Sequence, residues 1–475
     1  MNPAQMDAAQ IAARVAGGEL DPAEVACAFG RRIAALNPAL QAVVGEPAFV
    51  AAGDALRPSD ALAADIAHLR RCIAAGERLP LAGVPVVVKD VIWVRGCRVT
   101  QGSRLFEHFV APADAQPVQR LRQAGALPIG MANSSEFACK GVTTNLVYGP
   151  TRHPADPVLT PGGSSGGCAV AVAARLAPLA LGTDAGGSSR RPPAHVGVVG
   201  FKPSQGAIAD AVGFPHAFPG LSTPAPMAAS VADTALMFEA LAGEDPADPR
   251  SFALPGSGPI EPGAVRVAYS PRLGMDVPVD ADVAARVQDA AERLERAGFR
   301  VERADPPWPP GAGDDALFPL QHAALAALHG EAWKADPGRF DPDIGRQIER
   351  GLACTGVEVS AARELSWQIA LAMAAFMQRH DVLLSPTAPC VAWPLERLGP
   401  AEIGGVPVGP RGHAVFTSFA NHAGVPALSL PCGTGRDGLP VGAQLIAARG
   451  RDRFLLAFAR VLEALLAADR PHGVP

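Results

Sequence analysis

The sequence contains very little lysine. Of its 41 basic residues only four are lysines, Lys89, Lys140, Lys202 and Lys334. Where arginine is used so heavily, a remaining lysine becomes a candidate for a role that needs a titratable amine, because arginine keeps its proton. The formal net charge of −5 over 475 residues also argues against the basic surface that binds nucleic acid or an anionic membrane.

Long apolar runs, paired cysteines and a Walker-type phosphate motif are absent as well. No window reaches the ~18 uncharged apolar residues that cross a bilayer, and residues 1–20 lack the basic and apolar regions of a signal peptide. The eight cysteines are scattered without a CxxC pair or zinc spacing, which favours reduced thiols. No GK[ST] occurs, which argues against nucleotide binding. These absences predict a soluble, cytoplasmic protein that uses no cofactor or metal and binds neither nucleic acid nor membrane.

Strand and helix patterns alternate along the chain. Leu81–Val88 is an apolar, β-branched run, which predicts a buried strand that ends at Lys89. Cys168–Leu176 predicts a helix of small residues, and Pro178–Leu181 predicts another strand. Such alternation is typical of an α/β fold in which helices cover both faces of the sheet.

Two glycine turns, GGSSGG at 162–167 and GGSSRR at 186–191, carry serines 24 residues apart. The first turn opens into the predicted helix, so its N–H groups and the helix dipole favour an anion. The second turn follows the predicted strand and exposes consecutive N–H groups beside Ser188, as an oxyanion hole requires. Ser188 would still need a base to become a nucleophile.

Two residues are candidates for that base. His195 lies close in sequence, but no G-x-S-x-G elbow surrounds any serine, which argues against a histidine triad. Lys89 is the better candidate, because burial at the end of an apolar strand lowers the pKa of an amine. A surface ion pair between Lys89 and Asp90 is the structural alternative, and from Lys89 alone this alternative is favoured.

Together, these segments resemble the amidase signature family, serine hydrolases with a Ser–cis-Ser–Lys triad. The resemblance extends from the N-terminal helices to the end of the chain. The segments that carry it are GVPVVVKD (83–90), MANSSEFA (131–138), YGPTRHP (148–154), PGGSSGG (161–167), GTDAGGSSR (182–190) and NHAGVPALSLPCG (421–433).

The resemblance implies one compact α/β domain, 1–475, around a central mixed, twisted sheet. We expect N-terminal helices at about 1–75, a catalytic core at about 76–245, a helical excursion at about 246–380, and returning strands with a closing helix at about 381–475.

It also implies the roles of site residues. Lys89 takes the position of the general base, Ser164 that of the bridging serine in a cis peptide after Gly163, and Ser188 that of the nucleophile. The backbone N–H groups implied to form the oxyanion hole are those of Ala185, Gly186, Gly187 and Ser188.

Several neighbouring residues can also be interpreted. We interpret Ser165 as a support in the turn, while Ser189 stands where the family commonly has an apolar residue. Arg191 is a candidate ligand for a substrate carboxylate, although a structural pair of Arg190 or Arg191 with Asp184 is the favoured alternative. Cys139 and Cys168 are interpreted as packing residues, since nothing nearby would activate a thiol.

The family hydrolyses amides, and some members cleave esters or carbamates (urethanes). One branch is the glutaminase A-subunit of a tRNA-dependent amidotransferase, from whose usual pattern GGSSRRPPA and APMAAS depart here. A stand-alone amidohydrolase acting on C–N bonds of a small-molecule amide is therefore favoured, and an inactive binding or scaffold homologue is the non-enzymatic alternative. Gly206–Leu221 could be an apolar lid or a packed surface loop, and a homodimer is left open.

Overall fold

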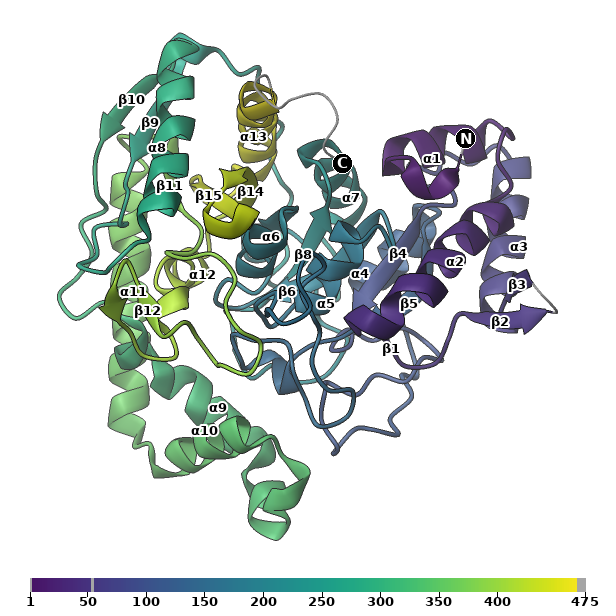
Figure 1. The fold of residues 1–475 in the computed structure, drawn as a ribbon, viewed down its shortest axis with the longest axis horizontal. Helices are drawn as coiled ribbons and strands as arrows, with labels where there is room; N and C mark the ends of the chain where they lie inside the picture. The colour runs from purple at the N-terminus through teal and green to yellow at the C-terminus, as the bar shows by residue number, and fades with distance from the viewer. Residues whose placement is uncertain (1, 53–54, 468–475) are drawn as a thin grey trace.

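The computed structural model describes residues 2–52 and 55–467. Within these ranges, eleven strands form one mixed sheet that runs across the molecule (Figure 1). The pairs β4–β5, β4–β6, β9–β10 and β9–β11 are parallel, and the remaining pairs are antiparallel. In spatial order the strands are β1 (Val43–Val44), β5 (Leu127–Ala132), β4 (Pro85–Lys89), β6 (Leu179–Asp184), β8 (Thr223–Ala228), β7 (Val199–Lys202), β14 (Ala427–Thr434), β15 (Pro440–Ile446), β11 (Val382–Pro386), β9 (Arg266–Tyr269) and β10 (Arg300–Arg303).

Helices flank the sheet, which confirms the predicted α/β fold. The short helices α5 (Gly166–Ala173) and α6 (Arg191–Val196) pack on each other and on the central strands. A second group of helices packs against the sheet and consists of α7 (Val231–Leu241), α8 (Ala281–Arg296) and α13 (Asp452–Ala467). Within this group, α13 contacts both α7 and α8. None of the helices in the described ranges has the length and apolarity needed to cross a membrane. The N-terminal helices are α1 (Ala8–Ala16), α2 (Pro22–Leu40) and α3 (Asp60–Ala74), followed by α4 (Gln116–Gln123).

Three helices extend from the sheet as an arm: α9 (Asp314–Ala335), α10 (Pro342–Ala353) and α11 (Gly356–Phe376) (Figure 1). They account for part of the helical excursion predicted at about 246–380. That segment is not entirely helical, however, because it also supplies β9 and β10 at one edge of the sheet. The sequence did not indicate these strands, since each has four residues and β10 is mostly exposed. Two hairpins, β2 (Phe49–Ala52) with β3 (Ala55–Pro58) and β12 (Glu402–Ile403) with β13 (Val406–Pro407), complete the strands.

The centre of the sheet brings the two glycine turns together. The adjacent strands β4 and β6 are parallel, so their carboxyl ends lie at the same edge of the sheet. Helix α5 begins in close contact with the core: a Cβ on Gly166 would lie 2.4 Å from Thr143 Oγ1, and one on Gly167 would lie 2.4 Å from the backbone of Asn133. Glycine at both positions therefore lets the GGSSGG turn sit directly beside the end of β4.

Candidate active site

The side chains of Lys89, Ser164 and Ser188 form a buried hydrogen-bonded chain. Lys89 Nζ lies 2.8 Å from Ser164 Oγ and 3.3 Å from Ser188 Oγ, and the two serine oxygens are 2.6 Å apart. The peptide bond between Gly163 and Ser164 is cis. The structure thus brings together three residues that the sequence separates by 75 and 24 positions.

Two further hydroxyls complete the surroundings of this chain. Thr183 Oγ1, near the end of β6, lies 3.0 Å from Lys89 Nζ. Ser165 Oγ lies 2.9 Å from Ser188 Oγ and donates to the Thr183 carbonyl at 3.2 Å. Ser165 therefore contacts the Ser188 hydroxyl directly, in agreement with its interpretation as a support in the turn.

Burial controls the charge of Lys89. The side chain is fully buried at the end of β4, and this desolvation lowers its pKa from 10.5 to about 8. A surface ion pair with Asp90 is excluded, because Asp90 is also buried and accepts hydrogen bonds from the hydroxyl and, at 2.8 Å, the N–H of Thr100. An amine with a pKa near 8 exists partly in its neutral form at neutral pH, and the neutral form can accept a proton.

Asp184 organises the second glycine turn. Its carboxylate accepts from the Gly187 N–H at 2.7 Å, from Ser189 Oγ at 2.7 Å and from Arg190 Nη2 at 2.9 Å. Burial alone would raise the pKa of Asp184, but the charge and hydrogen bond of Arg190, the charge of Lys202 and a hydrogen bond from Asn421 hold it well below its usual range. Ser189 thus binds the carboxylate that shapes the turn.

This contact corrects one part of the predicted oxyanion hole. The Gly187 N–H is taken up by Asp184, because the carboxylate is a strong acceptor within the same turn. The N–H groups of Ala185, Gly186 and Ser188 have no hydrogen-bond acceptor among the residues that the structure describes. For these three N–H groups the oxyanion role stays a prediction.

The pair of Arg190 with Asp184 is the structural alternative that the sequence favoured. Both side chains are completely buried, and Arg190 also donates to the Thr417 carbonyl and to the side chains of Asn421 and Gln444. Arg190→Met is expected to destabilise the protein by about 3–5 kcal/mol, because it leaves Asp184 buried without its counter-charge. The free energy of urea unfolding measures this loss.

The matched control is Arg57→Met, which breaks the exposed pair between Arg57 and Asp60. It should leave the unfolding midpoint almost unchanged, since exposed ion pairs contribute little. Equal stability losses in the two variants would contradict the structural role of Arg190.

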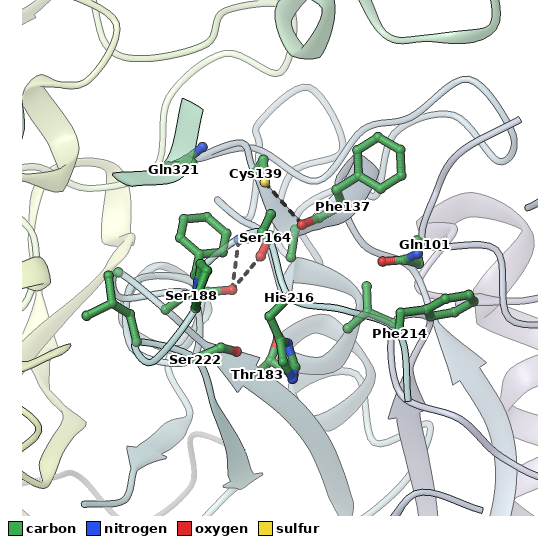
Figure 2. Close-up of a pocket in the computed structure, with 18 of the residues that line it drawn as sticks. Gln101, Phe137, Cys139, Ser164, Thr183, Ser188, Phe214, His216, Ser222 and Gln321 are labelled. Carbon is green, nitrogen blue, oxygen red and sulfur yellow. Dashed lines mark hydrogen bonds between the residues drawn. The ribbon is translucent and has the colours of Figure 1, made fainter. Parts of the chain in front are cut away.

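A pocket opens in front of Ser188 (Figure 2). Phe214 stands edge-on to Trp93 with ring centroids 5.5 Å apart, and Phe137 stacks on His329 at 4.1 Å. The 206–221 segment, predicted to be either a lid or a surface loop, supplies one side of the pocket. Other lining residues include Gln101, Cys139, Thr183, Arg191, His216, Ser222, Leu317, Phe318, Gln321, Arg411 and His422.

Arg191, the candidate ligand for a substrate carboxylate, lines this pocket but is itself only 5% exposed. Its Nη1 donates to the Gly186 carbonyl at 2.9 Å and to Thr417 Oγ1 at 3.2 Å. These bonds tie Arg191 to the second glycine turn, and its contact with substrate stays a prediction.

His195, the alternative base, makes no contact with the Ser188 hydroxyl, whose partners are Lys89, Ser164 and Ser165. Its ring stands edge-on to Trp393 at 5.3 Å. Burial lowers the pKa of His195 to about 3. Burial likewise raises the pKa of the Cys168 thiol to about 12, as expected for a packing residue.

Two residues from the C-terminal part of the chain approach the site, and the sequence did not indicate either of them. Thr417 Oγ1 donates to the Gly186 carbonyl at 2.7 Å, and Asn421 Nδ2 donates to Asp184 Oδ1 at 2.9 Å. Both residues belong to the short helix α12 (Ser418–His422) or immediately precede it. Asn421 is the first residue of the segment NHAGVPALSLPCG. Its distance in sequence from the glycine turns does not indicate that it contacts Asp184. No cluster of three or more histidine, cysteine or acidic side chains suited to a metal ion occurs in the described part of the chain.

Comparison with known proteins places this chain in a family. The Amidase family profile matches residues 24–456. The acylamidase of Rhodococcus erythropolis is 34% identical over 97% of this chain and 95% of its own length. The A-subunit of the glutamyl-tRNA(Gln) amidotransferase of Thermus thermophilus is also 34% identical, over 98% of both chains.

Solved structures agree with the sequence relatives. A bacterial aryl acylamidase of the amidase signature family superposes with a TM-score of 0.86 and 27% identity, covering 98% of this chain and 99% of the other. A 6-aminohexanoate cyclic dimer hydrolase, solved with its substrate, superposes with a TM-score of 0.82 and 27% identity over 99% of both chains. The chain therefore belongs to the amidase family. More particularly, it is an amidase signature hydrolase that acts on amide C–N bonds.

Proposed function

We propose that this chain is a stand-alone amidase that cleaves small-molecule amides through an acyl-enzyme on Ser188. The observation that carries the proposal is the buried chain from Lys89 Nζ through Ser164 Oγ to Ser188 Oγ, with steps of 2.8 and 2.6 Å. These distances permit direct proton transfer at each step. Burial keeps the pKa of Lys89 low enough for its amine to begin the transfer.

In the acylation step, neutral Lys89 takes the proton of Ser164 as Ser164 takes the proton of Ser188. Ser188 Oγ attacks the amide carbonyl, and the resulting oxyanion is stabilised by N–H groups of Ala185, Gly186 and Ser188. The proton returns along the same chain to the leaving nitrogen as the C–N bond breaks. Water then attacks the ester on Ser188, and its proton restores the Ser188 hydroxyl.

The lining of the pocket supports an aryl or aliphatic acyl group. Trp93, Phe137 and Phe214 offer apolar and aromatic surface, whereas Gln101 and Gln321 offer polar groups that can orient a substrate. We include carbamates and esters as secondary substrates, because the same attack on a carbonyl carbon cleaves them.

A substrate panel tests this proposal. We expect measurable turnover of p-nitroanilides and other aryl amides, with slower or comparable cleavage of matched esters and carbamates. Glutamine should give no ammonia release, because the GGSSRRPPA and APMAAS segments depart from the amidotransferase pattern. Hydrolysis rates at saturating substrate, with an ammonia assay for glutamine, supply the measurement.

Glutamine-dependent ammonia release that a partner protein stimulates would contradict a stand-alone amidase and favour the amidotransferase branch. Failure to turn over any member of the panel, together with failure to react with a fluorophosphonate, would favour the inactive binding homologue instead.

A further inference from the structure

The peptide unit between Gly186 and Gly187 precedes the proposed nucleophile and needs external support. Because glycine lies on both sides, rotation of this peptide meets little steric resistance. Gly187 adopts a φ of +113°, which side-chain-bearing residues rarely adopt. The direction of this peptide must therefore be fixed by the groups around it.

Three side chains fix it from both ends. The Gly186 carbonyl accepts from Thr417 Oγ1 at 2.7 Å and from Arg191 Nη1 at 2.9 Å. At the other end, the Gly187 N–H donates to Asp184 Oδ1 at 2.7 Å. With its oxygen and its hydrogen both bound, the peptide has one preferred orientation.

Thr417 packs directly against Gly187. It is fully buried, and a Cβ placed on Gly187 would lie only 2.0 Å from its Oγ1. Its hydroxyl also accepts from Arg191 Nη1 at 3.2 Å, while its carbonyl accepts from Arg190 Nη1 at 2.8 Å. The threonine thus links the second glycine turn to α12, whose Ser418 and His422 line the pocket.

We infer that Thr417 is a positioning residue for amide hydrolysis, acting through the peptide between Gly186 and Gly187. Its hydroxyl holds the Gly186 carbonyl in place. The next peptide, between Gly187 and Ser188, then has a fixed direction, and so do the N–H and Oγ of Ser188. This inference rests on the proposed function, because it assumes that Ser188 attacks the substrate. Preorganised donors matter most in the transition state, so loss of this hydroxyl acts on kcat.

The test substitution is Thr417→Val, which keeps the branched shape but removes the hydroxyl. We expect kcat on an aryl amide to fall about 3- to 10-fold, the effect of losing one hydrogen bond while Arg191 remains. KM should change less than about twofold, since ground-state binding is untouched. The pH dependence of kcat should keep its midpoint, because Thr417 does not contact Lys89.

Two further variants separate positioning from stability. Thr417→Ser restores the hydroxyl and should recover kcat to within about twofold of the parent, with one methyl group lost. Thr234→Val is the matched control: this buried threonine on α7 donates to the Ser230 carbonyl at 2.8 Å and does not line the pocket. It should lower the unfolding midpoint without lowering kcat.

The inference is overturned if Thr417→Val retains the parental kcat, or if Thr417→Ser is as slow as Thr417→Val. A parent enzyme that hydrolyses the amide but keeps its activity in Ser188→Ala would instead overturn the proposed function, so the two failures are distinguishable.

Discussion

Ser188→Ala is expected to lower kcat for an aryl amide by at least about 10³-fold, because it removes the oxygen that attacks the carbonyl. The fold should persist, since Lys89 Nζ keeps its contacts with Ser164 at 2.8 Å and Thr183 at 3.0 Å. Initial rates of the purified variant, together with its unfolding midpoint, measure both effects.

The neighbouring serine provides the control for this substitution. Ser189 Oγ donates to Asp184 at 2.7 Å and makes no hydrogen bond with Ser188 Oγ, so Ser189→Ala should cost less than about tenfold in kcat. Near-parental hydrolysis by Ser188→Ala would show that the reaction does not pass through an ester on this residue.

Lys89→Ala is expected to lower kcat by about 10²- to 10⁴-fold, the range of general-base catalysis. The pH dependence follows from the same residue. Because burial lowers the pKa of Lys89 to about 8 and the neutral amine is the active form, kcat/KM of the parent should rise as the pH rises through about 8. In Lys89→Ala this rise should disappear. Rates measured between pH 6 and pH 10, about two units on either side of the pKa, test both effects.

A second buried lysine supplies the control. Burial lowers the pKa of Lys202 to about 7, and its Nζ donates to the Pro203 carbonyl at 2.9 Å. Lys202→Met should keep the rise in kcat/KM near pH 8, because Lys202 makes no contact with either serine of the chain. If the rise in kcat/KM near pH 8 vanished in Lys202→Met but persisted in Lys89→Ala, the titrating group would be Lys202. That result would contradict the mechanism.

The sequence could predict the centre of the site because its residues lie in compact motifs. Lys89 follows an apolar run, and Ser164 and Ser188 stand in two glycine turns that join a helix or a strand. Each motif is short and local, and the resemblance of these motifs to the amidase signature family, not their spacing, indicated which residues meet. The pair of Asp184 with Arg190 was predictable because the two residues are only six positions apart in the sequence.

Other features depend on contacts between distant segments. Thr417 approaches Gly186 across 231 positions, and no periodicity marks a single threonine for that contact. The Gly187 N–H donates to Asp184 because of the orientation of a single peptide. Composition and spacing do not determine that orientation. The edge strands β9 and β10 were missed because their short, partly exposed sequences lack a clear alternation of apolar and polar residues.

The most direct test of the central claim is to label the active enzyme with a serine-directed fluorophosphonate and locate the adduct by mass spectrometry. We predict one adduct per chain, on Ser188, with labelling lost in Ser188→Ala and strongly slowed in Lys89→Ala. An adduct on Ser164 or Ser165, or an enzyme that hydrolyses amides at full rate without any labelling or inhibition, would contradict Ser188 as the nucleophile.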